Sequence, residues 1–473
     1  MIYRYVTFGS YGQWVGAFIV ASASFVSGTF LGWPASALPQ IRDGSAGFIL
    51  TDDEQSWMVT LGSIGSFFSP IPCGYLMDRI GRKYTLLLFD GLMLVSWIML
   101  TYSTTVVPIY IARILCGLWG GVEYTTVLLY ICEISEPRLR GTLGTIGELM
   151  LFSGAFFESV LAHLPYKIIA ACSAIPAIWL FVGLLLIPES PYFYLMRGNR
   201  EAATESVKWF RGSCKAEDMD KMETAVKEQL ANTGSFAEIF TSSVNFKALL
   251  IVQCLKIVLG SSSIILLLAY TSVILPDSWV SARNGFTVLC AVWIVSGVFA
   301  CTIMDKINRR TFLFVSSFGT LISLAFTSMW YYLRYKTSID TSTTTWVPLV
   351  TLIIAGSFET AGIFNVPNVV KGEIFAINIK SKASAISCMT AFLFEGITTF
   401  FYYPITRNIG LYFNFVKIMI TSALCIVIVK FALIETRGKS LEEIQLVLNN
   451  DCGDDDLVWT TNVLETRPIK STG

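Results

Sequence analysis

Two long apolar runs in this chain are separated by only a short charged segment, residues 74–83, and a loosely similar segment recurs at 305–310. A connection this short must join two membrane-crossing helices on the same side of the bilayer. Gly81 permits the reversal of the backbone, and the basic side chains beside it hold that side in the cytoplasm. The recurrence of the segment predicts that the chain consists of two related halves.

The composition predicts an all-α polytopic membrane protein. Hydrophobic residues make up 54% of the chain and charged residues only 14%, whereas soluble proteins carry roughly 25% charged residues. The 34 basic residues equal the 34 acidic residues in number, so no basic excess points to a nucleic-acid partner. The eleven cysteines are scattered and the only histidine is His163. We therefore expect no metal site, no cofactor and no enzymatic activity.

Twelve apolar stretches are long enough to cross a bilayer at about 20 residues per span. They cover residues 14–38, 54–77, 84–104, 107–131, 142–163, 167–187, 246–274, 281–304, 311–333, 346–370, 383–405 and 409–433. This division predicts an N-terminal six-helix bundle at 1–187 and a C-terminal one at 246–433. A cytoplasmic linker at 188–245 lies between them, and a cytoplasmic tail at 434–473 follows.

Basic residues in the short connections predict which side of the membrane each loop faces. Most of them fall on one side if every run crosses the bilayer, and that side is then the cytoplasm, together with both termini and the linker. These residues are Arg79, Arg82, Lys83, Arg138, Arg140, Lys306, Arg309, Arg310, Lys371, Lys380 and Lys382. The exceptions on the opposite face are Arg42, Lys167, Arg283, Arg334, Lys336 and Arg407.

Acid–base pairs recur in the same order in the two halves. Glu133 and Arg140 follow the fourth predicted span. In the second half, Glu373 and Lys380 follow the tenth span with the same separation of seven residues. Carboxylates are not needed for the positive-inside rule, so their matched spacing indicates a further role.

Seven motifs together cover nearly the whole chain. They are DRIGRK at 78–83, RILCG at 113–117, Glu133 with Arg140 and Gly141, PESP at 188–191, the charged segment at 305–310, GEIF at 372–375 and ETRGKSLEEI at 435–444. On these motifs the chain resembles a sugar porter of the major facilitator superfamily, and it is most similar to facilitative glucose transporters and insect-type trehalose transporters. The PESP and ETRGKSLEEI motifs are specific signals, whereas DRxGRK alone indicates only the superfamily.

The resemblance implies a fold and a use for the cytoplasmic charges. Two six-helix bundles are related by an axis along the membrane normal, and the substrate site lies between them. The charges resemble the family's salt-bridge network, which ties the bundles together on the inside when the site faces out. The residues concerned are Asp78, Arg79, Arg82, Glu133, Arg140, Glu189, Asp305, Arg309, Arg310, Glu373 and Glu435. The alternative is that these charges only fix the topology.

The linker at 188–245 is predicted to form short amphipathic helices. Within 200–211, the apolar residues Ala203, Val207 and Phe210 share one face at helical spacing. A similar stripe consists of Met219, Met222 and Val226. The resemblance implies that these helices lie under the bundles as an inner latch, and the alternative is a solvated linker.

The implied transport site is where the sequence departs from the family. Sugar hydroxyls need amide side chains that both donate and accept hydrogen bonds, beside aromatic faces in a dry cavity. The glutamines and the asparagine that the family places in the seventh span are absent here, and the stacking tryptophan of the tenth span aligns with an asparagine. The substrate-binding residues that the resemblance implies are Glu148, Ser262, Ile265, Asn368 and Phe392.

Ionisable residues lie inside several predicted spans, where burial of a charge is costly. Glu148 in the fifth span and Lys256 in the seventh both fall on helices that line the family's cavity. We therefore hypothesise that Glu148 and Lys256 form an intramembrane pair. The alternative is that Lys256 reaches back to the cytoplasmic interface along its own apolar stem.

The resemblance favours facilitative (uniport) transport of a hexose or a trehalose-like disaccharide by alternating access. Residues 15–38 of the first span hold no charge, whereas proton-coupled members of the family carry an acid there. The protein is expected to be monomeric, with a small-molecule sugar and the lipid bilayer as its partners, in the plasma membrane with both termini cytoplasmic. Two alternatives remain: a transporter-like solute sensor or non-transporting homologue, and a porter of a charged organic solute.

Overall fold

The computed structural model describes residues 11–136, 139–231, 235–276, 280–303, 306–375 and 379–437, together with 443–444 and 447–448. Within these ranges the regular elements are helices, and eleven segments are long and apolar enough to cross a membrane. The prediction of an all-helical polytopic membrane protein is confirmed. Asp305 and most of the predicted tail at 434–473 lie outside the described residues, as does the side chain of Arg140.

The six spans predicted for the first half are found as helices. They are α1 (Gly12–Arg42), α2 (Asp52–Phe68) with α3 (Pro70–Ile80), α4 (Arg82–Tyr102), α5 (Val106–Ile134), α6 (Arg140–Leu161) and α7 (Tyr166–Leu186). The second span was predicted as one helix, but it is divided after Phe68. Pro70 has no N–H group for the preceding turn, and the helix restarts with this proline in its first turn.

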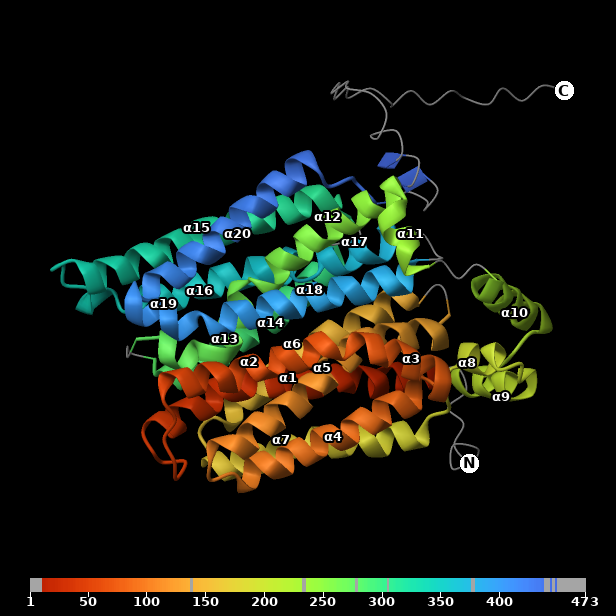
Figure 1. Cartoon of the computed structure of the whole chain (residues 1–473), viewed down its shortest axis with the longest axis horizontal. Helices are drawn as coiled ribbons and strands as arrows, with labels where there is room; N and C mark the ends of the chain where they lie inside the picture. The colour runs from red at the N-terminus through yellow and green to blue at the C-terminus, as the bar shows by residue number, and fades with distance from the viewer. Residues whose placement is uncertain are drawn as a thin grey trace.

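The linker forms four short helices, as its amphipathic pattern predicts. They are α8 (Pro191–Met196), α9 (Arg200–Arg211), α10 (Ala216–Ala231) and α11 (Phe236–Thr241). Ala203 and Val207 of α9 are buried against the predicted methionine stripe of α10. Phe210 packs instead against the start of α1, where a Cβ on Gly16 would meet its ring at 2.5 Å. α8, α9 and α10 gather at one end of the helical bundles (Figure 1).

The six spans of the second half are also helical, and three of them are interrupted. The elements are α12 (Ser243–Gly260) with α13 (Ser263–Ile274), α14 (Ala282–Ile303), α15 (Arg309–Lys336), the short η3 (Ser342–Thr344), α16 (Val347–Phe358) with the π-helical turn η4 (Glu359–Ile363) and α17 (Val366–Ile374), α18 (Lys380–Phe400) with α19 (Tyr402–Asn408), and α20 (Leu411–Phe431). The break between α12 and α13 falls inside a span that was predicted as continuous over 246–274.

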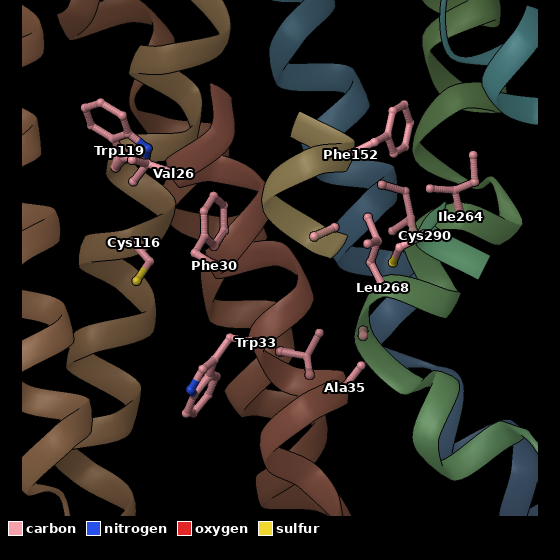
Figure 2. Close-up of a cluster of buried hydrophobic side chains, with 14 of the residues drawn as sticks. Val26, Phe30, Trp33, Ala35, Cys116, Trp119, Phe152, Ile264, Leu268 and Cys290 are labelled. Atoms are coloured by element: carbon pink, nitrogen blue, oxygen red, sulfur yellow. The ribbon is translucent and has the colours of Figure 1, made fainter. Parts of the chain in front are cut away.

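The helices of the first half and those of the second form neighbouring layers, drawn from red to yellow and from green to blue in Figure 1. One hydrophobic cluster runs through both layers. Figure 2 shows part of it: Val26 of α1 lies near Trp119 of α5, Phe30 and Trp33 follow further along α1, and Ile264 and Leu268 of α13 lie on the other side of α1. The interface between the halves is therefore largely apolar.

Close contact between helices of the first half depends on small residues. A Cβ added to Gly28 of α1 would fall on the carbonyl oxygen of Leu151 in α6, and one added to Gly117 of α5 would fall on that of Gly62 in α2. Backbones can approach this closely only where side chains are small. The two glycines thus hold α1 against α6 and α5 against α2, which positions the polar residues that these helices carry.

Candidate functional site

A cluster of charged side chains lies at one end of the first half, where α4 begins. Arg82 is buried at the start of α4, and its Nη2 donates to Oε1 of Glu133 at 2.9 Å. Ser190 donates to the other oxygen of Glu133. Glu189 accepts from the backbone N–H groups of Arg82 at 3.0 Å and of Lys83 at 3.0 Å, so its carboxylate sits at the N-terminus of α4. Burial raises the pKa of Glu189 to about 7.

The second half repeats this cluster. Nη2 of Arg309 lies 3.5 Å from Oε1 of Glu373, and Thr436 donates to the other oxygen of Glu373 at 2.6 Å. Glu435 accepts from the backbone N–H groups of Arg309 and Arg310, each at 3.1 Å. A carboxylate at the N-terminus of a helix is favoured by the helix dipole and by unpaired N–H groups. Glu189 and Glu435 therefore occupy equivalent positions at α4 and α15.

The two ion pairs each lie within one half. Asp78 is mostly exposed and lies 3.9 Å from Arg82, while Arg79 lies over the ring of Tyr75. Asp305 and the side chain of Arg140 lie outside the described residues. The expectation that these charges tie the two bundles together stays a prediction.

At the opposite end the second half holds a group of packed tyrosines, one of which reaches the first half. Tyr270 of α13 stacks on Tyr402 of α19 with ring centroids 4.1 Å apart, and it lies edge-on to Tyr403 at 5.5 Å. The hydroxyl of Tyr403 donates to the side-chain oxygen of Gln55 in α2 at 2.5 Å. This hydrogen bond crosses from the second half to the first, so the bundles are joined at the end away from the charged clusters.

A small cavity of about 20 Å³ lies between the halves, inside this aromatic layer. Its walls include Arg113 of α5, Ser63 of α2 and Glu395 of α18. Ser63 donates to Glu395 at 3.0 Å across the interface. Arg113 donates to the backbone carbonyls of Met58 and Phe30. Ligand pockets for small molecules usually enclose about 300–1,000 Å³, so this conformation is closed around its polar centre.

A second polar group, which we call the central cluster, consists of Tyr124, Glu148, Lys256, Lys371 and Asn368. The Lys256 ammonium donates to the Tyr124 hydroxyl at 2.8 Å and to Oδ1 of Asn368 at 2.5 Å. Tyr124 donates to the same oxygen at 2.5 Å, and Nδ2 of Asn368 lies 3.4 Å from Glu148. Lys371 lies over the Tyr124 ring, 5.0 Å from its centroid. The central cluster thus joins α5 and α6 of one half to α12 and α17 of the other.

The hypothesis of a Glu148–Lys256 pair needs correction. Among the described residues no ion pair joins the two side chains; Asn368 lies between them and binds one with its oxygen and the other with its nitrogen. The alternative, that Lys256 reaches the cytoplasmic interface, is also wrong. Lys256 is 0% exposed, and its ammonium group is held by Tyr124 and Asn368.

The other predicted site residues lie close to the central cluster or along the small cavity. The ring of Phe392 is edge-on to Tyr124 at 5.5 Å, and Ile265 lines the cavity beside Glu395. Ser262 lies at the start of α13 and is buried, and no partner for its hydroxyl is found among the described residues. The structure thus brings Glu148, Asn368 and Phe392 together and places Ile265 and Ser262 along the interrupted span.

Tyr124, Arg113 and Lys371 are residues of the site that sequence reasoning passed over. Arg113 entered the sequence analysis only as part of a motif. A charged residue within the predicted span 107–131 itself indicates a functional site. Lys371 was counted only for orientation. Tyr124 carries no signal in the sequence, because tyrosines are common in apolar spans.

Two further glutamates bind serines at equivalent positions in the two halves. Glu359 in η4 accepts from the backbone N–H of Ser263 at 3.0 Å and from its hydroxyl at 2.8 Å. Glu123 in α5 accepts from the hydroxyl of Ser27 at 3.2 Å, and Ser24 also donates to it. Both residues of the pair recur 236 residues later, from 123 to 359 and from 27 to 263. The internal repeat therefore extends into the membrane-spanning part of the chain.

Metal ligation finds no support in this geometry. In the part of the chain that the structure describes, no three histidine, cysteine, aspartate or glutamate side chains gather so that they could hold an ion. The polar groups instead suit a ligand that carries hydroxyl groups, because Asn368, Tyr124 and Glu148 offer both donors and acceptors.

Known proteins were compared with the chain and its structure. The sequence is 28% identical over 447 residues to the facilitated trehalose transporter Tret1 of Apis mellifera ligustica. This match covers 92% of this chain and 87% of that protein. It is 27% identical over 415 residues to the sugar transporter ERD6-like 6 of Arabidopsis thaliana, covering 84% of this chain and 82% of that protein.

The structure is similar to that of the xylose transporter XylE from E. coli in a partially occluded inward-open conformation. The TM-score is 0.76 at 16% sequence identity, and the match covers 91% of this chain and 99% of that one. An inward-open structure of the same protein gives a TM-score of 0.74 at 18% identity, with coverage of 91% and 99%. These likenesses establish the fold, which is the predicted major facilitator fold.

A family model decides the classification, because it spans nearly the whole chain. The model described as "Sugar (and other) transporter" matches residues 11–448. That match, together with the fold and the relatives above, confirms the resemblance that the motifs carry. The chain belongs to the family of sugar (and other) transporters, and it has the major facilitator fold.

Proposed function

We propose that this protein is a facilitative transporter, a uniporter, that carries a hexose or a trehalose-like disaccharide by alternating access. Two of the relatives reported above are a facilitated trehalose transporter and a sugar transporter. Residues 15–38 of the first predicted span hold no ionisable side chain, so the acid that the resemblance implies there for proton-coupled members of the family is absent.

The central cluster is the observation that carries the proposal. Its polar side chains come from both halves and meet where the seventh span is interrupted between α12 and α13. Substrate sites of such transporters lie at the interface of the two repeats, beside discontinuous helices. Sugar hydroxyls can exchange hydrogen bonds with Asn368, Tyr124 and Glu148, while Phe392 offers an aromatic face nearby.

The contacts at the two ends of the bundles indicate how the protein would change between outward-open and inward-open states. The hydrogen bond between Tyr403 and Gln55 closes the outer end and has to break for the site to open outward. The cytoplasmic charge clusters hold the inner ends of α4 and α15 rigid, so each bundle moves as a unit. In the outward-open state these clusters would approach each other and close the inner end, as the predicted network requires.

The remaining assignments concern the setting of the protein. The basic residues of the short connections support cytoplasmic termini, and the linker helices α8, α9 and α10 lie at the same end as the charge clusters (Figure 1). We assign the protein to the plasma membrane. We also assign it as a monomer, because a substrate path between the two halves of one chain needs no second copy.

Counterflow in proteoliposomes tests the proposal. The purified protein is reconstituted, the vesicles are loaded with unlabelled glucose or trehalose, and uptake of the labelled sugar is followed. We expect transient accumulation that depends on the internal sugar and does not change with an imposed pH gradient. Absence of counterflow for every sugar tried, from protein that is folded by its thermal unfolding, would contradict the proposal. Accumulation that follows the proton gradient would contradict the uniport mechanism alone.

A further inference from the structure

The central cluster holds an excess of positive charge. Lys256 and Lys371 flank the ring of Tyr124, with their ammonium groups 5.3 Å and 5.0 Å from its centroid. Glu148 is the only carboxylate of the central cluster among the described residues, and it contacts the other members through Asn368. Two lysines and one glutamate leave one positive charge in a site that lies deep between the bundles.

The hydrogen bonds of Lys256 do not neutralise its charge. An ammonium group has three N–H donors, and two of them are directed at neutral oxygens, those of Tyr124 and Asn368. Lys371 lies 3.7 Å from the thiol of Cys388. In the described part of the chain no carboxylate lies within ion-pair distance of either lysine. A buried charge without a counter-ion, such as that of Lys256, is costly. Such positions in membrane proteins mark substrate or ion pathways, proton relays or the counter-ions of ligands.

We propose that the preferred substrate is a sugar that carries a carboxylate, such as a hexuronate, and that this group binds Lys256 and Lys371. The inference rests on the proposed function, because it names the class of sugar for the same central cluster. A carboxylate supplies the one negative charge that the cluster lacks, whereas a phosphate ester carries about two. Asn368 and Glu148 remain available for the sugar hydroxyls, and Phe392 for the ring.

The carboxylate also explains why amide side chains are replaced in this pocket. The site residues of the family are neutral amides, which bind hydroxyl groups through paired donors and acceptors. In this chain the amides that the resemblance implies for the seventh span are absent, Asn368 stands where the resemblance implies a tryptophan, and Lys256 lies one helical turn before the break of the seventh span. An ammonium group forms stronger, charge-assisted hydrogen bonds with a carboxylate than with a hydroxyl.

Competition in the counterflow assay tests the inference on the unmodified protein. Inhibition of labelled glucose counterflow is compared for glucuronate, for its neutral methyl ester and for glucose 6-phosphate. We expect glucuronate to inhibit at concentrations at least tenfold lower than either of the others. Labelled glucuronate should also enter faster when the vesicle interior is made positive, because a uniporter that carries an anion moves charge, whereas glucose entry should not respond.

Variants then locate the effect. Lys256→Met and Lys371→Met should each remove the preference for glucuronate over its ester, while Lys417→Met serves as a matched control. Lys417 is a half-buried lysine of α20 that donates to the Thr398 carbonyl, away from the central cluster. Loss of the preference in the control as well would overturn the assignment of the carboxylate to Lys256 and Lys371.

The two proposals fail in different ways. Glucose or trehalose counterflow that glucuronate and its ester inhibit equally overturns the inference and leaves sugar transport standing. Equal or stronger inhibition by glucose 6-phosphate overturns the choice of a carboxylate. The absence of counterflow for every sugar, neutral or acidic, overturns both proposals. The comparison of glucuronate with its ester needs no variant, so the test holds even where Lys256→Met does not fold.

Discussion

Glu359 holds the interrupted seventh span in place by binding Ser263, the first residue of α13. Its carboxylate accepts hydrogen bonds from the N–H and the hydroxyl of Ser263 and from the N–H of Ile264. Glu359 is 0% exposed. In a membrane no water can satisfy the free N–H groups at a helix start, so a side chain 96 residues further along the chain takes that role.

Replacement of Glu359 by glutamine should therefore destabilise the protein. An amide has one acceptor oxygen in place of two, which leaves an N–H group of α13 unpaired at a cost of about 1–3 kcal/mol. Glu123→Gln is the matched control, because Glu123 accepts only from the hydroxyls of Ser24 and Ser27, which can turn toward other acceptors. Thermal unfolding in detergent should show the larger decrease in Tm for Glu359→Gln. Equal decreases in Tm would contradict the capping role.

Asn368 should mediate the energetic coupling between Glu148 and Lys256. A double-mutant cycle with Glu148→Gln and Lys256→Gln, measured by thermal stability, should give a coupling energy of about 0.5–3 kcal/mol. The same cycle in an Asn368→Ala background should give a value near zero, because the amide that contacts both side chains is gone. A coupling energy that survives Asn368→Ala would indicate a direct interaction of the two charges.

The helical spans were predictable from the sequence because apolar length and flanking charge determine them locally. The charged turns were predictable for the same reason, and Gly81 indeed has a positive φ of 99° at the turn. The buried face of α9, which carries Ala203 and Val207, was also predictable, because amphipathic spacing indicates which face of a helix is buried. That this face packs with residues of α10 was not predicted.

The interior of the site was harder to predict, because it depends on how each helix is rotated about its axis. The sequence indicated that Glu148 and Lys256 lie on neighbouring helices, but not that Asn368 of a third helix would come between them. The break before Ser263 was hidden within an apolar run, since the carboxylate that makes it tolerable belongs to the tenth span. The contacts of Asn368 and Glu359 join residues 96 to 220 positions apart, and the local sequence pattern carries no information on them.

Stability should depend on pH through Glu189 in the charged cluster at the start of α4. Burial raises its pKa from the ordinary 4.5 to about 7. Below pH 4.5 the carboxyl is protonated in both the folded and the unfolded states. Between pH 4.5 and 7 the folded state holds a proton that the unfolded chain has released, so stability falls as the pH rises, by roughly 3 kcal/mol in all. Above about pH 7 this contribution no longer changes.

The variant Glu189→Gln isolates this effect. Its Tm relative to that of the unmodified protein should rise as the pH increases from 4.5 to 7, because the glutamine cannot ionise. Glu223→Gln is the control: Glu223 is a partly buried residue of the linker, and its hydrogen bond with Lys227 keeps its pKa below the ordinary value. A pH profile for Glu189→Gln parallel to that of the unmodified protein would show that the carboxyl is not protonated in the folded state.

The hydrogen bond between Tyr403 and Gln55 should set the balance between outward-open and outward-closed conformations. Tyr403→Phe keeps the ring that packs against Tyr270 and removes only the hydroxyl that reaches the other half. A hydrogen bond of this kind contributes about 0.5–1.5 kcal/mol, so the outward-open population should rise roughly two- to tenfold. Opening of the outer end exposes the cavity that Ile265 lines.

Labelling measures this shift. Ile265→Cys is introduced into a background without native cysteines, and the rate of its reaction with an impermeant maleimide is followed from the outside. We expect faster labelling with Tyr403→Phe than without it. Tyr335→Phe is the matched control, because the Tyr335 ring stacks on Tyr331 within α15 and makes this contact inside one half only. Unchanged labelling in Tyr403→Phe would mean that contacts other than this hydrogen bond keep this end closed.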